Sequence, residues 1–319
     1  MIRIFNGNRA GVLLLIPFFI AFYIILNNYT QHFPVEASIN LGFWGRADVL
    51  FPLLGQIASG AIVFVNALLI NYIFNNNEFF DRNTYITSLT YVILMSFFHS
   101  FYFLDGMLLS HFFLLLVFQQ IFYLNQNSDG KRNVFNAFFW AGLAATFHPP
   151  LLICLPILIV IMRIIRPFIF KEFLLLVVGY SIPLAYAFAF LWISEHKIHL
   201  KLFEQTTNYS AQQINFLITS VLFTLLFILG LISNRLKNKT STIRLKKLTS
   251  ILFWWLIAGI GLGLFDFLNY AQIERFSFVI FVLTIYLNFA LNNKTFQFIA
   301  NAMFYLTFAY SIVKFFISI

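Results

Sequence analysis

Long apolar runs, separated by short polar stretches, constrain this chain more than any other feature of its sequence. The first follows MIRIFNGNR and continues for seventeen apolar or small residues before Asn27. A helix that crosses a membrane needs about 20 mostly apolar residues, within a range of roughly 17 to 25. Of all residues, 61% are hydrophobic and only 10% are charged, whereas a soluble domain carries about 25% charged residues. The sequence therefore predicts an integral membrane protein.

The predicted fold class is all-α, a polytopic integral membrane protein with about eleven transmembrane helices. The first run is longer than the 7–15 residues usual in a signal peptide, and no small-x-small cleavage site follows before Asn27, so we interpret it as a retained helix. No internal repeat or separate soluble domain is visible, which predicts a single transmembrane domain over residues 1–319. The predicted spans are 10–27, 50–74, 84–104, 106–124, 134–147, 151–166, 172–194, 216–233, 251–268, 277–291 and 296–318.

The distribution of Lys and Arg predicts a cytoplasmic N-terminus. With that orientation, fifteen of the 20 Lys and Arg residues lie in inner segments and five lie outside, and these residues do accumulate in short cytoplasmic loops. The net charge of +9 then comes mainly from Lys and Arg residues on the cytoplasmic side of the membrane. We therefore expect membrane lipid, and no nucleic acid, as a partner. The densest inner cluster, which we expect to meet anionic headgroups, consists of Arg235, Lys237, Lys239, Arg244, Lys246 and Lys247.

Other titratable side chains gather on the predicted outer side. Five of the 6 histidines fall in or beside outward-facing connections, and the sixth, His111, lies near the outer end of its helix. Titratable chemistry is therefore predicted on this side. Its seven acidic residues, out of 11 in the chain, are Glu36, Asp48, Asp105, Glu195, Glu204, Asp266 and Glu274.

Two outer segments hold polar residues next to helices. The sequence HPP at 148–150 ends a helix predicted from Val134, because proline lacks a backbone donor and clashes with the preceding turn. Either this helix begins nearer Lys131, or His148 lies below the outer surface in a water-filled cavity. Asp266 lies near the outer end of GIGLGLFDF, whose glycines indicate close helix packing. Its carboxylate is either functional or reaches the surface by snorkelling.

Metal and thiol chemistry receive little support from the sequence. If EHKIH at 195–199 is helical, its acid and histidines share a face and could hold a divalent metal ion. A solvated loop is the favoured interpretation, so no cofactor is predicted. The single cysteine, Cys154, excludes an internal disulfide, and we interpret it as a small hydrophobic residue.

The hexapeptide AQIERF, residues 271–276, puts a charged pair between two long apolar runs. On the outer side, Arg275 could hold a phosphate at the membrane boundary, because guanidinium donors match phosphate oxygens and the charge does not titrate away. Glu274 could orient the guanidinium. The alternative is an interfacial ion pair that anchors the helix ends.

Three stretches resemble segments of GT-C-type glycosyltransferases. QIERFSFVIFVLTIYLNFA is similar to the late-helix motif of that class, AGLAATFHPPLLICLPILIVIMR to its middle helix pair, and LDGMLLSHFFLLLVFQ to its fourth helix. The resemblance implies a GT-C-like module over residues 1–194, followed by an outer loop and C-terminal helices over 195–319. It also implies transfer of a sugar from a polyprenyl-phosphate carrier to an acceptor on the periplasmic side.

The resemblance further implies a catalytic carboxylate in the first outer loop. Asp48, in FWGRAD, is the first candidate for the base that takes the acceptor's proton, and Glu36, in FPVEAS, is the second. Arg275 would bind the phosphate of the donor. The other candidates for substrate or phosphate binding are Glu274, Arg46, His148, Asp266 and Asp105.

Two features depart from that class. The first outer loop is only about twenty residues long, and it contains no D-x-D or D-E pair. A non-catalytic membrane subunit of an envelope machine, or a lipid or polysaccharide transporter, is therefore the alternative. Transporters usually show symmetric half-repeats, and none is visible. The high Phe and Asn content is typical of an AT-rich bacterial genome, which predicts the cell inner membrane as the location.

Overall fold

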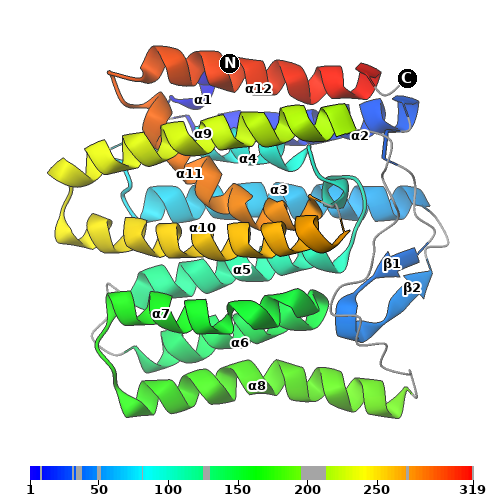
Figure 1. Ribbon diagram of the computed structural model, residues 1–319, viewed down its shortest axis with the longest axis vertical. Helices are drawn as coiled ribbons and strands as arrows, with labels where there is room; N and C mark the ends of the chain where they lie inside the picture. Colours follow the sequence, from blue (N-terminus) through cyan, green and yellow to red (C-terminus); the bar gives the residue numbers. More distant parts are fainter. Residues whose placement is uncertain are drawn as a thin grey trace. The chain divides into compact units, whose positions relative to one another are not determined.

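Helices make up most of the structure, which agrees with the predicted class. A computed structural model describes residues 1–7, 9–30, 32–33, 38–48, 52–80, 82–124, 130–194, 213–270 and 273–317 (Figure 1). One small addition is an antiparallel pair of strands, β1 (Ser38–Asn40) and β2 (Arg46–Asp48). The α-helices are α1 (Ile2–Phe5), α2 (Ile16–Thr30), α3 (Pro52–Asn76), α4 (Ile86–Met95), α5 (Gly106–Leu124), α6 (Lys131–Phe147), α7 (Leu155–Ile165), α8 (Phe170–Ile193), α9 (Gln213–Thr240), α10 (Ile243–Tyr270), α11 (Ile280–Leu291) and α12 (Gln297–Ile317). The 3-10 segments are η1 (Ala10–Leu15), η2 (Gly42–Trp44), η3 (His99–Phe101), η4 (Pro149–Cys154) and η5 (Glu274–Val279).

Among the described residues, eight helical segments are long and apolar enough to cross a membrane. They coincide with eight of the eleven predicted spans, and they support a multi-pass membrane protein. These segments are Ala10–Thr30, Leu53–Asn76, Gly106–Leu124, Phe170–Ile193, Ile218–Lys239, Ile243–Leu268, Glu274–Leu291 and Gln297–Phe316.

The three other predicted spans are helical but shorter. The span predicted at 84–104 contains only the helix Ile86–Met95, and the one at 151–166 matches Pro149–Ile165. The third, predicted at 134–147, is α6. This helix begins at Lys131, which confirms the alternative in which it starts before Val134. Its 17 residues rise about 25 Å. The count of eleven spans therefore stays a prediction.

The chain divides into two compact units, and each is described by itself. Unit 1 consists of Met1–Val35, Val63–Tyr102 and Gln205–Ile319, and unit 2 consists of Glu36–Ile62 and Phe103–Glu204. The predicted single domain, with its module boundary after residue 194, stays a prediction.

The central element of unit 1 is α11. All of its residues are buried, and it packs against α4, α9, α10 and α12, between which it runs obliquely (Figure 1). A helix that is apolar on every side suits such a central position. The apolar run that the sequence shows at 277–291 therefore forms the core of this unit.

Unit 2 is built around α6, which packs against both α5 and α8. Two glycines permit the contact between α6 and α8. A Cβ on Gly142 would lie 2.6 Å from the carbonyl oxygen of Tyr180, and one on Gly179 would lie 2.8 Å from that of Phe135. A side chain at either position would force the two helices apart.

The first predicted outer loop is fixed to unit 2 by η2. This segment packs against α6 and α8, and Trp44 donates its Nε1–H to Oγ1 of Thr146 at 3.1 Å. Gly42 has a φ of 66°, and a Cβ there would collide with the carbonyl of Phe147. Because only glycine combines this backbone angle with so close an approach, the hairpin that carries Asp48 is held against these helices.

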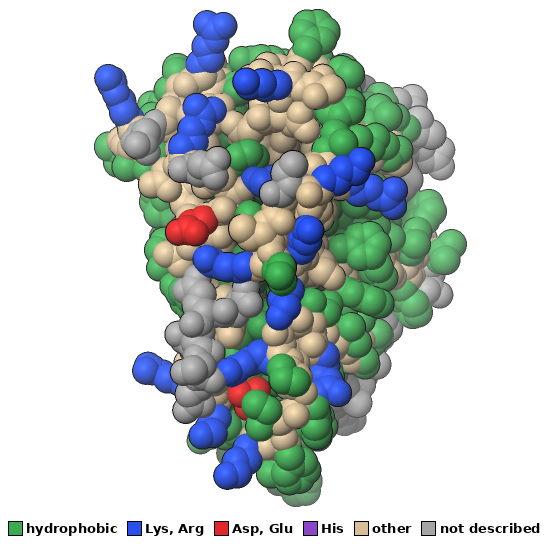
Figure 2. Space-filling view, turned by 90° about the vertical axis from the view of Figure 1, so that its left-hand side faces the viewer, with side chains coloured by type: hydrophobic (Ala, Val, Ile, Leu, Met, Phe, Trp, Pro, Cys, Tyr) green, Lys and Arg blue, Asp and Glu red, His purple; other side chains and the backbone are tan. Residues whose placement is uncertain are grey.

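Residues assigned to the cytoplasmic side share one end of unit 1. Arg244 pairs with Glu78 at 3.6 Å, and Arg82 donates to Asn292 at 3.4 Å. Lys237 donates to a backbone carbonyl next to Glu78 in the chain. Figure 2, turned by 90° from the view of Figure 1, draws Lys and Arg side chains in blue and acidic side chains in red. The grouping fits the orientation predicted from the sequence.

Single-cysteine labelling tests the span count. In a Cys154→Ala background, Ser241→Cys should react with a membrane-impermeant maleimide only from the cytoplasmic side, and Asn40→Cys only from the outside. With the eight long helices alone, five spans would precede Ser241 and its cysteine would face outward; with eleven spans it faces inward. Outward labelling of Ser241→Cys would therefore contradict the eleven-span topology.

Candidate functional site

Two glycines of α10 allow η5 to lie against this helix. A Cβ on Gly259 would lie 2.9 Å from an atom of the Val279 side chain, and one on Gly263 would collide with the ring of Phe276. The two glycines are four residues apart and share one helical face, which Asp266 extends. The close packing predicted from GIGLGLFDF is thus confirmed at these two positions, and it brings η5 to Asp266.

Gly263→Ala should lower the free energy of unfolding by about 1–3 kcal/mol, because the added methyl group would overpack the contact with Phe276. Gly261 is the matched control, since a Cβ there meets no atom within 4 Å. Gly261→Ala should be neutral or stabilising by up to about 1 kcal/mol, as expected for a glycine in a helix interior. Unfolding in mixed micelles, followed by tryptophan fluorescence, measures both. Equal effects would show that the contact is not tightly packed.

A buried ion pair forms where η5 meets α10. Nη1 of Arg275 donates to Oδ1 of Asp266, and the two side chains are only 7% and 2% exposed. A carboxylate in a membrane helix is costly unless it is paired, so this partner explains Asp266 without snorkelling. Both residues are conspicuous in the sequence, but their pairing was not predicted from it. The contact fits the alternative in which AQIERF anchors helix ends, with Asp266 as the partner of Arg275.

The carboxylate of the neighbouring Glu274 stabilises the break between α4 and η3. It accepts the backbone N–H of His99 at 3.1 and 3.2 Å. His99 begins η3, after α4 has ended at Met95. Because a buried N–H outside a helix needs an acceptor, this charged acceptor stabilises the break. The predicted role of Glu274 in orienting Arg275 stays a prediction.

Lys314, which the sequence places only among the outer cations, is a further functional candidate. It lies in the last turn of α12 and is 3% exposed. Its Nζ donates to the carbonyl of Ser96 and lies 3.5 Å from Oη of Tyr102. Aromatic rings surround the ammonium, and the nearest ring centroids belong to Phe97 at 4.7 Å and Phe315 at 4.9 Å. A lone lysine within an apolar run was the signal that could have identified it.

These side chains put two cations and two carboxylates at one end of unit 1. Glu274 and Lys314 both hydrogen-bond the backbone just after α4, at His99 and Ser96 respectively, and Arg275 pairs with Asp266. His32 lies beside this group. Burial, with a smaller contribution from the positive charge of Lys314, lowers the pKa of His32 to about 4, so the imidazole is neutral at pH 7. Arg275, Asp266 and Lys314 are buried and Glu274 is half-buried, and we call these four residues the buried charge group.

Two further candidates lie together in unit 2. His148 follows the last residue of α6, and two prolines then begin η4, as the HPP sequence predicts. Asp105 accepts the backbone N–H of Leu108 at 2.7 Å and so caps the start of α5. A Cβ on Gly106 would collide with the carbonyl of Phe147, so the start of α5 lies against the end of α6. Asp105 and His148 therefore belong to the same end of this unit.

The predicted catalytic carboxylates fall in the segment before α3. Asp48 and Arg46 are in β2, where Asp48 stands opposite Ser38 of β1, whereas Glu36 lies outside the described residues. Asp48 belongs to unit 2 and Arg275 to unit 1. Their predicted meeting in one outer cavity stays a prediction.

Neither metal nor thiol chemistry gains support from the described residues. No group of three or more His, Cys, Asp or Glu side chains within them could hold a metal ion. The segment EHKIH at 195–199 lies outside them. Cys154 is buried, which fits its interpretation as a small hydrophobic residue.

Comparisons of this chain with protein-family models, with curated proteins and with solved structures found no match.

Proposed function

We propose that this chain is an integral membrane glycosyltransferase of the GT-C type with eleven transmembrane helices. It transfers a sugar from a polyprenyl-phosphate carrier to an acceptor on the periplasmic side of the cell inner membrane. The observation that supports this proposal is the buried charge group, which lies at one end of a set of apolar helices. Ionisable residues inside membrane segments are rare and usually mark a functional site.

In the proposed reaction, a hydroxyl oxygen of the acceptor attacks the anomeric carbon of the sugar. The bond from that carbon to the phosphate oxygen breaks, and Asp48 takes the hydroxyl proton as general base. The carrier phosphate leaves with the bonding electrons, and Arg275 stabilises its negative charge with the help of Lys314. Glu36 is the second candidate for the base, and Arg46 and His148 are candidate helpers.

Arg275 suits the phosphate role even though it already has a partner. A guanidinium carries five N–H donors and no acceptor, and one of its nitrogens, Nη1, donates to Asp266. The carboxylate would hold the guanidinium in place, and the planar shape of the guanidinium matches the oxygens of a phosphate. Lys314 would add a second positive charge without a fixed donor direction.

A non-catalytic membrane subunit is the second candidate, and the Arg275–Asp266 pair favours it. Both side chains are buried, and their pairing adds to the glycine contacts that hold η5 against α10, a structural role that needs no phosphate. If the pair is purely structural, an apolar pair of similar size could replace it without loss of function.

The test is sugar transfer by purified full-length protein in nanodiscs. The protein is incubated with radiolabelled polyprenyl-phosphate sugars of several kinds and with a membrane-lipid extract as acceptor. We expect labelled sugar to move to the acceptor as polyprenyl phosphate is released. Monodisperse protein that releases no carrier from any donor would contradict the proposal and favour the subunit.

A further inference from the structure

The connection between α9 and α10 carries a dense cluster of positive charge. Residues 235–247 contain six Lys and Arg residues and no acidic residue. Since α9 ends at Thr240 and α10 begins at Ile243, these cations lie at the ends of two candidate membrane spans. Phospholipid headgroups occupy this level of a membrane, and basic clusters there attract anionic lipids.

Three of these cations are available to a ligand. Arg235, Lys239 and Lys246 are exposed, and their side chains make no hydrogen bond or ion pair with the residues that the structure describes. Apolar side chains accompany them on the same helix ends: Leu236 is 37% exposed and Ile243 is 77% exposed. A surface that joins free cations to exposed apolar side chains matches a lipid, whose phosphate and acyl chains lie next to each other.

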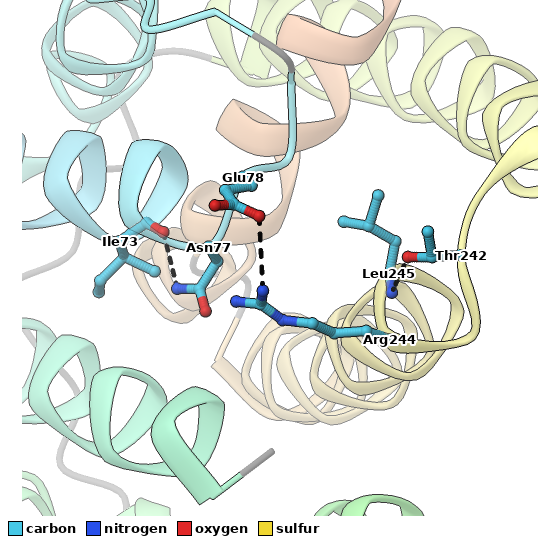
Figure 3. Close-up of polar contacts among 6 residues, drawn as sticks. All are labelled: Ile73, Asn77, Glu78, Thr242, Arg244 and Leu245. Carbon is cyan, nitrogen blue, oxygen red and sulfur yellow. Dashed lines mark hydrogen bonds and ion pairs between the residues drawn. The ribbon is translucent and has the colours of Figure 1, made fainter. Parts of the chain in front are cut away.

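Arg244 is only partly satisfied by the protein. Figure 3 shows its guanidinium reaching from α10 towards Glu78, which follows α3. The distance from Nη1 to Oε2 of Glu78 is 3.6 Å, and the Glu78 side chain is 78% exposed. Nε and Nη2 of Arg244 are enclosed and have no hydrogen-bond partner among the described residues. Buried donors without an acceptor are unfavourable, so this position favours a further acceptor.

We propose that the α9–α10 connection binds the phosphate of an anionic phospholipid headgroup. Arg244 is the phosphate ligand, because a guanidinium presents paired N–H donors that bind two phosphate oxygens in parallel. Lys239 and Lys246 add electrostatic attraction, and the acyl chains lie along the exposed apolar side chains of the helix ends. The site does not depend on sugar transfer, and it would operate in a transferase or in a subunit.

The affinity of purified full-length protein for dioctanoyl phosphatidylglycerol, measured in detergent by thermophoresis, tests this site. Each of Lys239→Gln and Lys246→Gln should weaken binding about fivefold, the effect of one basic residue near an anionic surface. Arg244→Gln should weaken it further, because it also loses the paired hydrogen bonds. Arg132→Gln is the matched control: Arg132 is exposed and lies in the first turn of α6, so its removal should leave the affinity unchanged.

Two parallel titrations distinguish a headgroup site from a site for any free anion or any lipid. Dioctanoyl phosphatidylcholine and inorganic phosphate should both bind at least about tenfold more weakly than the anionic lipid. Equal binding of either one would overturn the proposal, in favour of a general lipid surface or of a free-anion site. Unchanged lipid affinity in Arg244→Gln would also overturn it. If that variant is not monodisperse, the lipid affinity of the double variant Lys239→Gln/Lys246→Gln is measured in its place, since both side chains are exposed. Unchanged affinity in this double variant would overturn the proposal.

Discussion

Arg275→Met should lower the free energy of unfolding by about 3–5 kcal/mol, the usual cost of removing one partner from a buried ion pair. The substitution would leave the carboxylate of Asp266 enclosed without a counter-charge, because both side chains are almost fully buried. Asp266→Leu should have a similar effect, since it leaves the guanidinium unpaired. Unfolding in mixed micelles measures both changes, and Lys294→Met, which removes an exposed cation, should change the stability little.

The double variant Asp266→Leu/Arg275→Met separates structure from function. Apolar residues of similar size often replace a buried ion pair without loss of stability, so most of the stability should return. If Arg275 also binds the carrier phosphate, this stable double variant should still lack sugar transfer. Full transfer activity in the double variant would contradict the phosphate role. A loss of stability in the double variant equal to the sum of the losses in the two single variants would show that the two residues are not coupled.

The positions of the helices could be predicted because each apolar run is long and has polar residues at its ends. The runs at 216–233 and 251–268, for example, lie within α9 and α10. The observed helices are longer than these runs, because basic residues such as Lys237 and Arg244 continue the helix. Apolar length reports the membrane-buried part of a helix, and it does not show where the helix ends in water.

The early end of α4 could not be predicted from local sequence. The predicted span 84–104 contains no proline and no glycine, yet the helix ends at Met95. The acceptor for the N–H of His99 comes from Glu274, which is distant in the chain, and the donor to the carbonyl of Ser96 comes from Lys314. A break that depends on such tertiary partners leaves no signal in the segment itself.

The candidate site could be predicted only in part, for the same reason. Arg275 and Asp266 are conspicuous because charges are rare in apolar sequence, but their pairing depends on how closely η5 approaches Gly259 and Gly263. The eleven-span topology places Lys314 on the outer side, because the last predicted span, 296–318, ends there. Only the folded chain shows that rings from distant segments, those of Phe33, Phe97 and Tyr102, lie around its ammonium.

Asp48→Asn should reduce sugar transfer by about 100- to 10,000-fold, the range that general-base catalysis contributes. Asparagine keeps the size of the side chain and cannot take a proton from the acceptor. The hairpin should persist in the variant, because β1 and β2 pair through their backbones and η2 is fixed to unit 2 through Trp44 and Gly42. The fall should therefore appear in the rate at saturating donor, with little change in the stability of the protein.

Glu204→Gln is the matched control, because Glu204 is another acid of the predicted outer side and the change again replaces a carboxylate with an amide. Its transfer rate should equal that of the unmodified protein. If Glu36→Gln lost activity while Asp48→Asn kept it, the base would be the second candidate of the same loop. If both variants kept full activity, no carboxylate of this loop would take the proton. The fixed hairpin would then serve only to hold the chain before α3 near α6 and α8, and the base would have to come from another segment.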